Sequence, residues 1–242
     1  QGAGYAADGY ARLQIRPAAC FPTSGPGLAN LTAAAATAHA DSVPMLIVAP
    51  GPEIGTEGGD RGRLHEMRDQ FAMMSGILEW TFRPHSASEA AAVILESVRR
   101  MEIQRPRPAY VEVPLDVLEG PWNGELPTSL MAHHAQAPDP AALDRAALAL
   151  STAPRVVMVL GGGARGAARA SAELAERLGA AVVTTVNGKG IVDEREDWAL
   201  GASLRLEAAR VVVRDADAVL MVGAEWSDSD LWGGSEAPAG TV

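Results

Sequence analysis

The sequence predicts an α/β protein with two doubly wound, mostly parallel-sheet domains. Uninterrupted apolar runs at residues 43–48 and 156–160 are typical of strands that are covered on both faces. Helix-length segments separate successive apolar runs, and connections of that length join parallel rather than antiparallel strands. At 242 residues, the chain has room for two such domains.

Proline, polar and capping residues set the expected element ends in the first half. Pro17 ends the first helical pattern, and Asp41 with Ser42 breaks the second. Ser86, followed three residues later by Glu89, is a capping box that starts another helix. The expected elements are helices over 1–12, from 28 to the break at 41, over about 71–78 and from 86, and strands over 18–21, 43–48 and 109–113.

A stretch rich in proline and glycine divides the chain. We therefore expect a first domain over residues 1–118, a linker over 119–138 and a second domain over 139–242. Both domains are expected to be incomplete, because the chain begins inside a helical pattern and ends where another strand is expected. Asp139 is the expected N-cap of the first helix of the second domain. Further elements expected there are strands over 156–160, 181–184 and 218–222 and helices over 167–178 and 207–214.

Composition excludes several classes of function. Acidic residues outnumber basic ones by 30 to 20 without a basic stripe, which argues against nucleic acid or an anionic membrane as partner. The single cysteine, Cys20, rules out a disulfide framework and a cysteine-based metal site within one chain. His133 and His134 lack a third ligand, so no metal site is predicted in this chain. No apolar run reaches transmembrane length, and a cytoplasmic location is expected.

The residues Ser24, Gly25, Pro26 and Gly27, here named the SGPG turn, lie between an apolar strand and an alanine-rich helix. Glycine permits positive φ and proline fixes φ, so the chain changes direction sharply here. The free N–H groups of the following helix face whatever lies beyond the strand. Taken alone, the turn is also compatible with a plain connection between strand and helix.

A second glycine motif, Gly161-x-Gly163-x-x-Gly166, fits the dinucleotide-binding fingerprint between a strand and a helix. The NAD form of that fingerprint needs an acidic residue about twenty positions later. Residues 180–190 contain neither Asp nor Glu. Close packing of a glycine-rich helix start is therefore favoured. A non-catalytic module that binds FAD or another nucleotide remains the alternative from a different class.

Glycines and charged residues alternate over residues 51–70, here named the charged loop. Long surface loops of this kind often carry function. His65 lies in this loop beside Glu66, where an acid or base would be exposed to substrate. His65 is therefore the candidate catalytic residue of the chain.

Three ordered segments, residues 1–12, 23–31 and 41–44, resemble the pyrimidine-binding domain of thiamine diphosphate enzymes of the acetolactate synthase type. Residues 184–190 are similar to the central domain of the same family. The resemblance therefore covers nearly the whole chain. It implies an enzyme in which the thiazolium ring of the cofactor attacks a 2-oxo acid and accepts electrons as CO₂ leaves.

The resemblance also implies where the cofactor binds. The glutamate that activates the cofactor would lie just before Gln1, and Mg²⁺ would bind on a C-terminal domain outside this chain. The pyrimidine ring would lie between subunits of a homodimer or homotetramer, so the chain alone is expected to be inactive. The residues expected beside the ring are Ser24, Gly25, Pro26, Gly27 and Asn30.

The charged loop departs from acetolactate synthase at one triplet. Those enzymes have Phe-Gln-Glu where this chain has Leu64-His65-Glu66. Residues 61–66 look more like the 5-guanidino-2-oxopentanoate decarboxylase branch, although an acetolactate synthase-type carboligase remains an alternative. Carboxylates suit a guanidinium substrate because they accept its paired N–H groups. The expected substrate residues are Glu57, Asp60 and Glu66.

Overall fold

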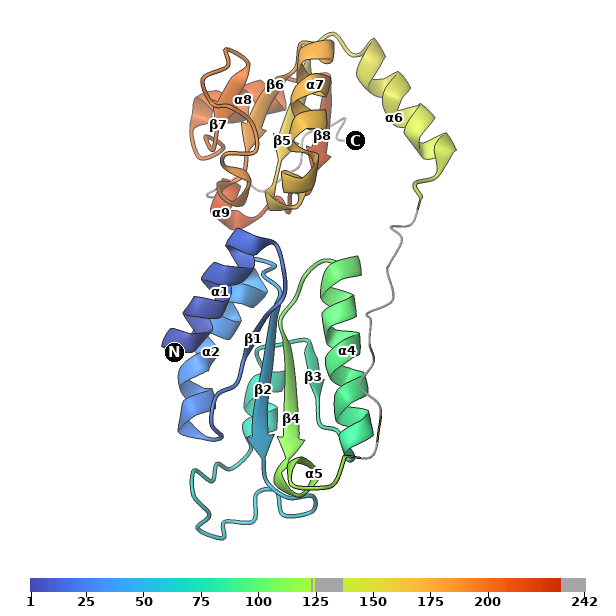
Figure 1. The fold of residues 1–242 in the computed structure, drawn as a ribbon. Helices are drawn as coiled ribbons and strands as arrows, with labels where there is room; N and C mark the ends of the chain where they lie inside the picture. Colours follow the sequence, from blue (N-terminus) through green and yellow to red (C-terminus); the bar gives the residue numbers. More distant parts are fainter. Residues whose placement is uncertain (123, 125–136, 232–242) are drawn as a thin grey trace. The chain divides into compact units, whose positions relative to one another are not determined.

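A computed structural model describes residues 1–122, 124 and 137–231 of the chain (Figure 1). The chain divides into two compact units, Gln1–Ala135 and Gln136–Val242. Each unit contains one four-stranded parallel sheet with helices on both faces. The predicted α/β class with two doubly wound parallel sheets is therefore confirmed. His133 and His134 lie outside the described residues.

The sheet of the first unit has the strand order β1-β2-β4-β3. All neighbouring pairs in it are parallel. Three of its strands were predicted, but β3 was not, because Trp80–Phe82 is interrupted by Thr81 and flanked by Glu79 and Arg83 and so forms no continuous apolar run. The strands are β1 (Ala18–Cys20), β2 (Met45–Gly51), β3 (Trp80–Phe82) and β4 (Ala109–Pro114).

Helices of the first unit follow the predicted order with shifted ends. The first helix runs two residues beyond the predicted end, and Ile15 closes it in the left-handed conformation at φ 53°. The helix predicted over 71–78 starts one residue earlier and stops at Ser75, ahead of Gly76. The helices are α1 (Gly2–Gln14), α2 (Pro26–Ala40), α3 (Gln70–Ser75), α4 (Ala87–Ile103) and α5 (Leu115–Leu118).

Alternate side chains of β2 enter two separate cores. Met45 and Ile47 pack with residues of α1, α2 and α3 on one face of the sheet. Leu46 packs on the other face, with residues of α4. Figure 1 shows α1 and α2 on one side of β2 and β4, and α4 on the other. Burial on both faces explains why this strand has an unbroken apolar sequence.

The N-cap of α4 gives a first testable prediction. Ser86 Oγ accepts a hydrogen bond from the Glu89 N–H at 3.2 Å, as the capping box predicts. Ser86→Ala is expected to lower the free energy of unfolding by about 1 kcal/mol, because that N–H loses its partner. Urea denaturation measures the change, with Ser88→Ala at an exposed position of the same helix as the control. Equal effects of the two substitutions would contradict the cap.

The sheet of the second unit has the strand order β7-β6-β5-β8, again with every neighbouring pair parallel. The three predicted strands are confirmed with their predicted bounds, whereas the three-residue β7 was missed. Asp139 caps α6 by accepting a hydrogen bond from the Ala141 N–H at 3.0 Å, as predicted. The strands are β5 (Val156–Leu160), β6 (Ala181–Thr184), β7 (Ala199–Gly201) and β8 (Ala218–Val222).

Helices cover both faces of this second sheet as well. Met158 packs with residues of α7, whereas Val157 and Val159 pack with Val213 of α8. The helix predicted over 167–178 is α7, and a 3₁₀ segment precedes it. The remaining elements are α6 (Pro140–Thr152), η1 (Gly162–Ala167), α7 (Ala168–Leu178), η2 (Val186–Gly188), α8 (Glu207–Arg214) and α9 (Asp228–Leu231).

Glycines bring three backbone segments of the second unit into direct contact. Gly161 and Gly163 face Gly223, the residue after β8, and the Gly163 N–H donates a hydrogen bond to the Gly223 carbonyl at 3.0 Å. A Cβ on Gly161 would lie 2.1 Å from that carbonyl oxygen, and a Cβ on Gly188 would lie 2.1 Å from the oxygen of Leu160. These positions admit glycine alone because the neighbouring atoms are backbone atoms.

Candidate functional site

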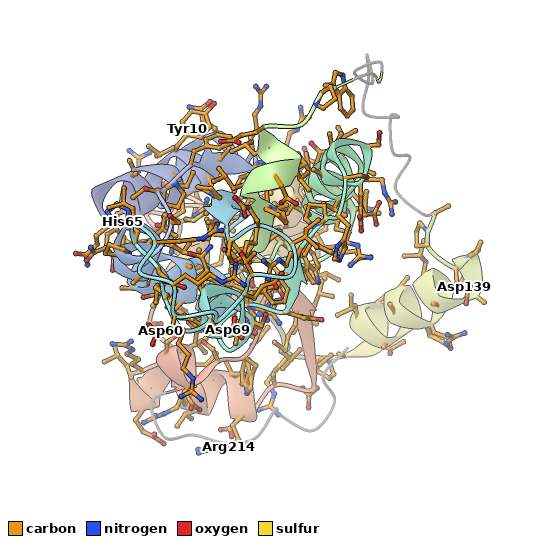
Figure 2. All side chains as sticks on the ribbon, turned by 90° about the horizontal axis from the view of Figure 1, so that it is seen from below. Tyr10, Asp60, His65, Asp69, Asp139 and Arg214 are labelled. Atoms are coloured by element: carbon orange, nitrogen blue, oxygen red, sulfur yellow. The ribbon has the colours of Figure 1, made fainter. Side chains whose placement is uncertain are left out.

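A cavity of about 450 Å³ lies in the first unit, where the carboxyl ends of the strands of its sheet meet. Ser24 follows β1, Gly51 ends β2, Arg83 follows β3, and Glu112 belongs to β4. Much of the charged loop supplies the remaining wall. Figure 2 looks onto this edge and shows His65, Asp60 and Asp69 at separate points along that loop.

The cavity lies at the topological switch point of the sheet. The chain leaves β2 for α3 on one face, and it leaves neighbouring β4 for α5, whose Val117 belongs to the core on the other face. Adjacent strands whose connections diverge in this way leave a crevice at their carboxyl ends. In open α/β sheets, ligands bind in such crevices.

The SGPG turn reaches the cavity through Ser24, whereas Gly25, Pro26 and Gly27 are not among the residues that line it. Gly25 has φ 62° and ψ −118° and is the N-cap residue of α2. A Cβ at Gly25 would lie 2.2 Å from the carbonyl oxygen of His65, so only glycine lets the charged loop approach the turn. Ser24 lines the cavity. Asn30 points elsewhere, because its amide donates a hydrogen bond to the Pro26 carbonyl at 3.0 Å.

Gln70, the first residue of α3, is buried beside the turn. Its Oε1 accepts a hydrogen bond from the Gly25 N–H at 3.0 Å. Its Nε2 donates to the Pro50 carbonyl at 2.8 Å and to the Tyr110 hydroxyl at 3.3 Å. One side chain therefore links the SGPG turn to the end of β2 and to β4.

Tyr110 and Glu112 continue this chain of hydrogen bonds along β4. The Tyr110 hydroxyl donates to Glu112 Oε2 at 2.9 Å, and both side chains are fully buried. Burial raises the pKa of the Glu112 carboxyl, since the charged form loses its hydration. Burial likewise raises the pKa of Tyr110. We name Gln70, Tyr110 and Glu112 the buried relay.

Arg83 joins the buried relay to the charged loop. Its Nη1 lies 3.4 Å from Glu112 Oε1, and its Nη2 lies 2.9 Å from Glu57 Oε1. The same Nη2 donates to the Pro52 carbonyl at 3.1 Å. Glu112 Oε1 is buried and has no hydrogen-bond partner. A Cβ at Gly51 would lie 2.8 Å from that oxygen, so glycine is required at the end of β2.

The structure brings some of the predicted loop residues to the cavity and leaves others apart. His65, Glu57 and Glu66 line the cavity, whereas Asp60 is exposed and is absent from its lining. Glu66 accepts the backbone N–H groups of Arg61 and Arg63, each at 3.0 Å, and these bonds lower the pKa of its carboxyl. Two of the three predicted substrate carboxylates are thus already bonded within the protein, Glu57 to Arg83 and Glu66 to the loop backbone.

Sequence reasoning missed the buried relay and Arg83. One signal was available, because Glu112 stands inside an otherwise apolar strand, and a buried carboxylate needs a partner. Arg83 and Gln70 carried no such signal. Arg83 follows an edge strand that was itself missed, and Gln70 looks like any polar residue at a helix start.

The glycine motif of the second unit is engaged in packing. Gly161 and Gly163 contact the backbone after β8, as the favoured interpretation of the motif requires. Lys189 forms an ion pair with Glu194 at 2.7 Å. Within the described ranges, no group of three or more His, Cys, Asp or Glu side chains is arranged to hold a metal ion. The described helices include none of sufficient length and apolarity to span a bilayer.

Comparison with known proteins agrees with the resemblance seen in the sequence. Residues 1–73 match the family model of the N-terminal TPP-binding domain of thiamine pyrophosphate enzymes. Residues 143–241 match the model of the central domain of the same enzymes. The first match contains the SGPG turn, His65 and Gln70, and the second contains the glycine motif.

Similar curated proteins cover almost the whole chain. A probable 2-ketoarginine decarboxylase of Pseudomonas aeruginosa is 37% identical over 233 residues, which are 96% of this chain and 42% of that protein. An acetolactate synthase of Arthrospira platensis is 31% identical over 247 residues, 94% of this chain and 41% of that protein. The chain therefore spans about two fifths of the length of these relatives. Together, the two family models and these relatives show that the chain belongs to the thiamine pyrophosphate enzymes.

Proposed function

We propose that the cavity of the first unit receives the pyrimidine end of thiamine diphosphate in an enzyme that decarboxylates 2-oxo acids. One observation carries the proposal. Ser24 of the SGPG turn and much of the charged loop, both within the matched TPP-binding region, line a cavity at the switch point of the sheet. That is where a doubly wound sheet binds its ligand.

Size and chemistry of the cavity fit an aminopyrimidine. About 450 Å³ lies within the range of small-ligand pockets and exceeds the volume of one planar ring. The lining combines the Ser24 side chain with the buried Glu112, one of whose oxygens has no hydrogen-bond partner. Such groups can pair with the ring nitrogens and amino group of a pyrimidine.

We assign the residues of the chain roles around that ring. Ser24, Gly25, Pro26 and Gly27 form the wall beside it, and Asn30 supports this wall through its bond to the Pro26 carbonyl. His65 holds or moves a proton at its imidazole, on the loop segment that contacts Gly25. When bound, the cofactor supplies a thiazolium carbon that accepts the electrons released with CO₂.

We further propose a substrate whose side chain ends in a guanidinium. The relative from Pseudomonas aeruginosa is named a probable 2-ketoarginine decarboxylase, and carboxylates of the charged loop suit such a group. Glu57 and Glu66 line the cavity, and Asp60 is exposed on the same loop. A carboligase is the second candidate, favoured by the similarity to acetolactate synthases.

The remaining parts of the site are proposed to come from outside this chain. Mg²⁺ would be held together with the diphosphate by residues that this sequence does not contain. A homodimer or homotetramer that acts in the cytoplasm would complete the cofactor site from a second subunit. Sedimentation of the full-length enzyme with and without thiamine diphosphate tests this assembly.

A decarboxylation assay on the full-length enzyme tests the proposed function. With thiamine diphosphate and Mg²⁺, we expect CO₂ release from the guanidino 2-oxo acid at a kcat/KM at least about tenfold above that for pyruvate. Formation of acetolactate from pyruvate at a higher kcat/KM would favour the carboligase instead. If the enzyme is active on no 2-oxo acid, both the decarboxylase and the carboligase candidates are contradicted.

His65→Ala in the same enzyme tests the proposed proton carrier. A general acid or base contributes about 10²- to 10⁴-fold, so kcat is expected to fall by at least about a hundredfold. His65→Gln keeps a polar side chain that cannot titrate and should be equally slow. Unchanged kinetics for either variant with several 2-oxo acids would remove His65 from the site.

A further inference from the structure

We propose that Gln70 is the positioning residue that holds the SGPG turn in place for the pyrimidine ring. The inference rests on the proposed function, since it names how that cofactor wall is fixed. Gln70 is 6% exposed, and its amide bonds three different segments of the first unit.

The orientation of the Gln70 amide is forced by its neighbours. The Gly25 backbone N–H can only donate, so it requires the Oε1 of Gln70 at 3.0 Å. The Pro50 carbonyl can only accept, so it requires the Nε2 at 2.8 Å. A flipped amide would oppose both groups at once. The turn and the end of β2 are therefore held at one fixed separation.

The N-cap of α3 and the bond to Tyr110 together fix where Gln70 lies. Asp69, the N-cap of α3, accepts a hydrogen bond from the Ala72 N–H at 2.8 Å and so fixes where the helix begins. Tyr110 accepts from Gln70 Nε2 and donates to Glu112, so the direction of the buried relay is set from α3 towards β4. The position of the turn therefore depends on that of β4, because Gln70 bonds to both.

Gln70→Leu and Gln70→Glu separate positioning from packing. Leucine fills the space but leaves the buried Gly25 N–H without an acceptor. A donor that water cannot reach is destabilising when it loses its hydrogen bond. Glutamate keeps the acceptor for Gly25 but, when ionised, presents an oxygen to the Pro50 carbonyl. When protonated, it can donate to that carbonyl as glutamine does.

The first measurement is calorimetric titration of the full-length enzyme with thiamine diphosphate and Mg²⁺. We expect Gln70→Leu to bind about tenfold more weakly at every pH. Gln70→Glu is expected to bind normally at low pH and more weakly as pH rises, because its carboxyl ionises. Charged or titratable groups near this position, which set that pKa, are Asp69, His65, Arg83, Tyr110 and Glu112.

The second measurement is amide hydrogen exchange of the peptide that contains Gly25, in enzyme without cofactor. Gln70→Leu should speed exchange at Gly25, since its N–H loses the Oε1 partner. Ser86→Ala serves as the control, because it destabilises the same unit without touching the turn. Faster exchange at Gly25 in Ser86→Ala as well would mean that any loss of stability explains the result.

The outcomes separate this inference from the proposed function. If the unsubstituted enzyme does not bind thiamine diphosphate, the proposed function fails, while the exchange result still reports on the turn. If the unsubstituted enzyme binds thiamine diphosphate, and both Gln70 variants match it in affinity, pH dependence and Gly25 exchange, then Gln70 does not position the turn. Weak binding by Gln70→Glu that is independent of pH would likewise overturn the positioning role.

Discussion

Gly25→Ala is expected to unfold the SGPG turn and to lower the free energy of unfolding by about 3 kcal/mol or more. The backbone at Gly25 has φ 62° and ψ −118°, where a side chain costs strain energy by itself. The new Cβ would also lie 2.2 Å from the carbonyl oxygen of His65. The charged loop must then retreat, and the Gly25 N–H must leave Gln70. Binding of thiamine diphosphate by the full-length enzyme should be lost.

Gly179→Ala is the matched control for this substitution. Gly179 has φ 60° and ψ 32° at the end of α7, and a Cβ there meets nothing within 4 Å. The alanine therefore carries only the strain of a left-handed backbone, about 1 kcal/mol. Chemical denaturation of both variants gives the comparison. If Gly25→Ala lowers the free energy of unfolding by no more than Gly179→Ala does, contact between the charged loop and the turn adds nothing to the backbone strain.

Arg83→Met is expected to cost about 3 kcal/mol at neutral pH, because it leaves the Glu112 carboxylate buried without its ion pair. The Glu112 side chain is 1% exposed, and the Arg83 side chain is 17% exposed. Methionine fills the space of the arginine stem but supplies no donor. Glu57 and the Pro52 carbonyl lose their partner too, so the charged loop should also become easier to cleave by proteases.

The pH dependence of this cost identifies Glu112 as its source. Folding raises the pKa of Glu112 above its ordinary value of 4.5, so the folded state binds the proton more tightly than the unfolded state. Stability is therefore highest below that value and falls as pH rises through the raised pKa. Removing Arg83 raises the pKa further, because its positive charge favours the carboxylate.

Urea denaturation at several pH values compares Arg83→Met with the double variant Arg83→Met, Glu112→Gln. The single variant should lose less stability at pH 5 than at pH 7, because Glu112 is then partly neutral. The double variant should lose this difference, since glutamine carries no charge. If Arg83→Met lowers the free energy of unfolding equally at both pH values, loss of the ion pair with Glu112 is not the source of the cost.

Much of the fold could be predicted from the sequence because most of the strands are covered on both faces. Strands such as β2 and β5 show unbroken apolar runs, and capping residues such as Ser86 mark where helices begin. The edge strands β3 and β7 could not be predicted. Each lies in an apolar run of no more than three residues, whereas the equally short edge strand β1 lies in the four-residue apolar run Ala18–Phe21. Pairing with an existing sheet, and not local pattern, therefore decides that β3 and β7 are strands.

The sequence predicted the segments that form the site but not the side-chain contacts between them. The SGPG turn and the charged loop were identified, and the structure brings Ser24 and His65 to one cavity. The link between the turn and β4 could not be predicted from the sequence. Gln70 bonds to Gly25, which lies 45 positions before it, and to Tyr110, which lies 40 positions after it. The substrate role of Glu57, Asp60 and Glu66 stays a prediction. What the sequence did not indicate is that Glu57 pairs with Arg83 and that Glu66 accepts loop N–H groups.

The glycine contacts of the second unit have a consequence for how that unit can change. At the carboxyl edge of its sheet, the backbone after β5 packs directly against the backbone after β8. A side chain at Gly161 or Gly163 would require the strand exit at Gly223 to move away. Gly161 and Gly163 are each confined by Gly223, and Gly223 is confined by Gly163 and Ala164, so a substitution at any of the three glycines requires the opposite segment to move. Side chains are therefore excluded from this part of the second unit unless the chain segments after β5 and β8 move apart.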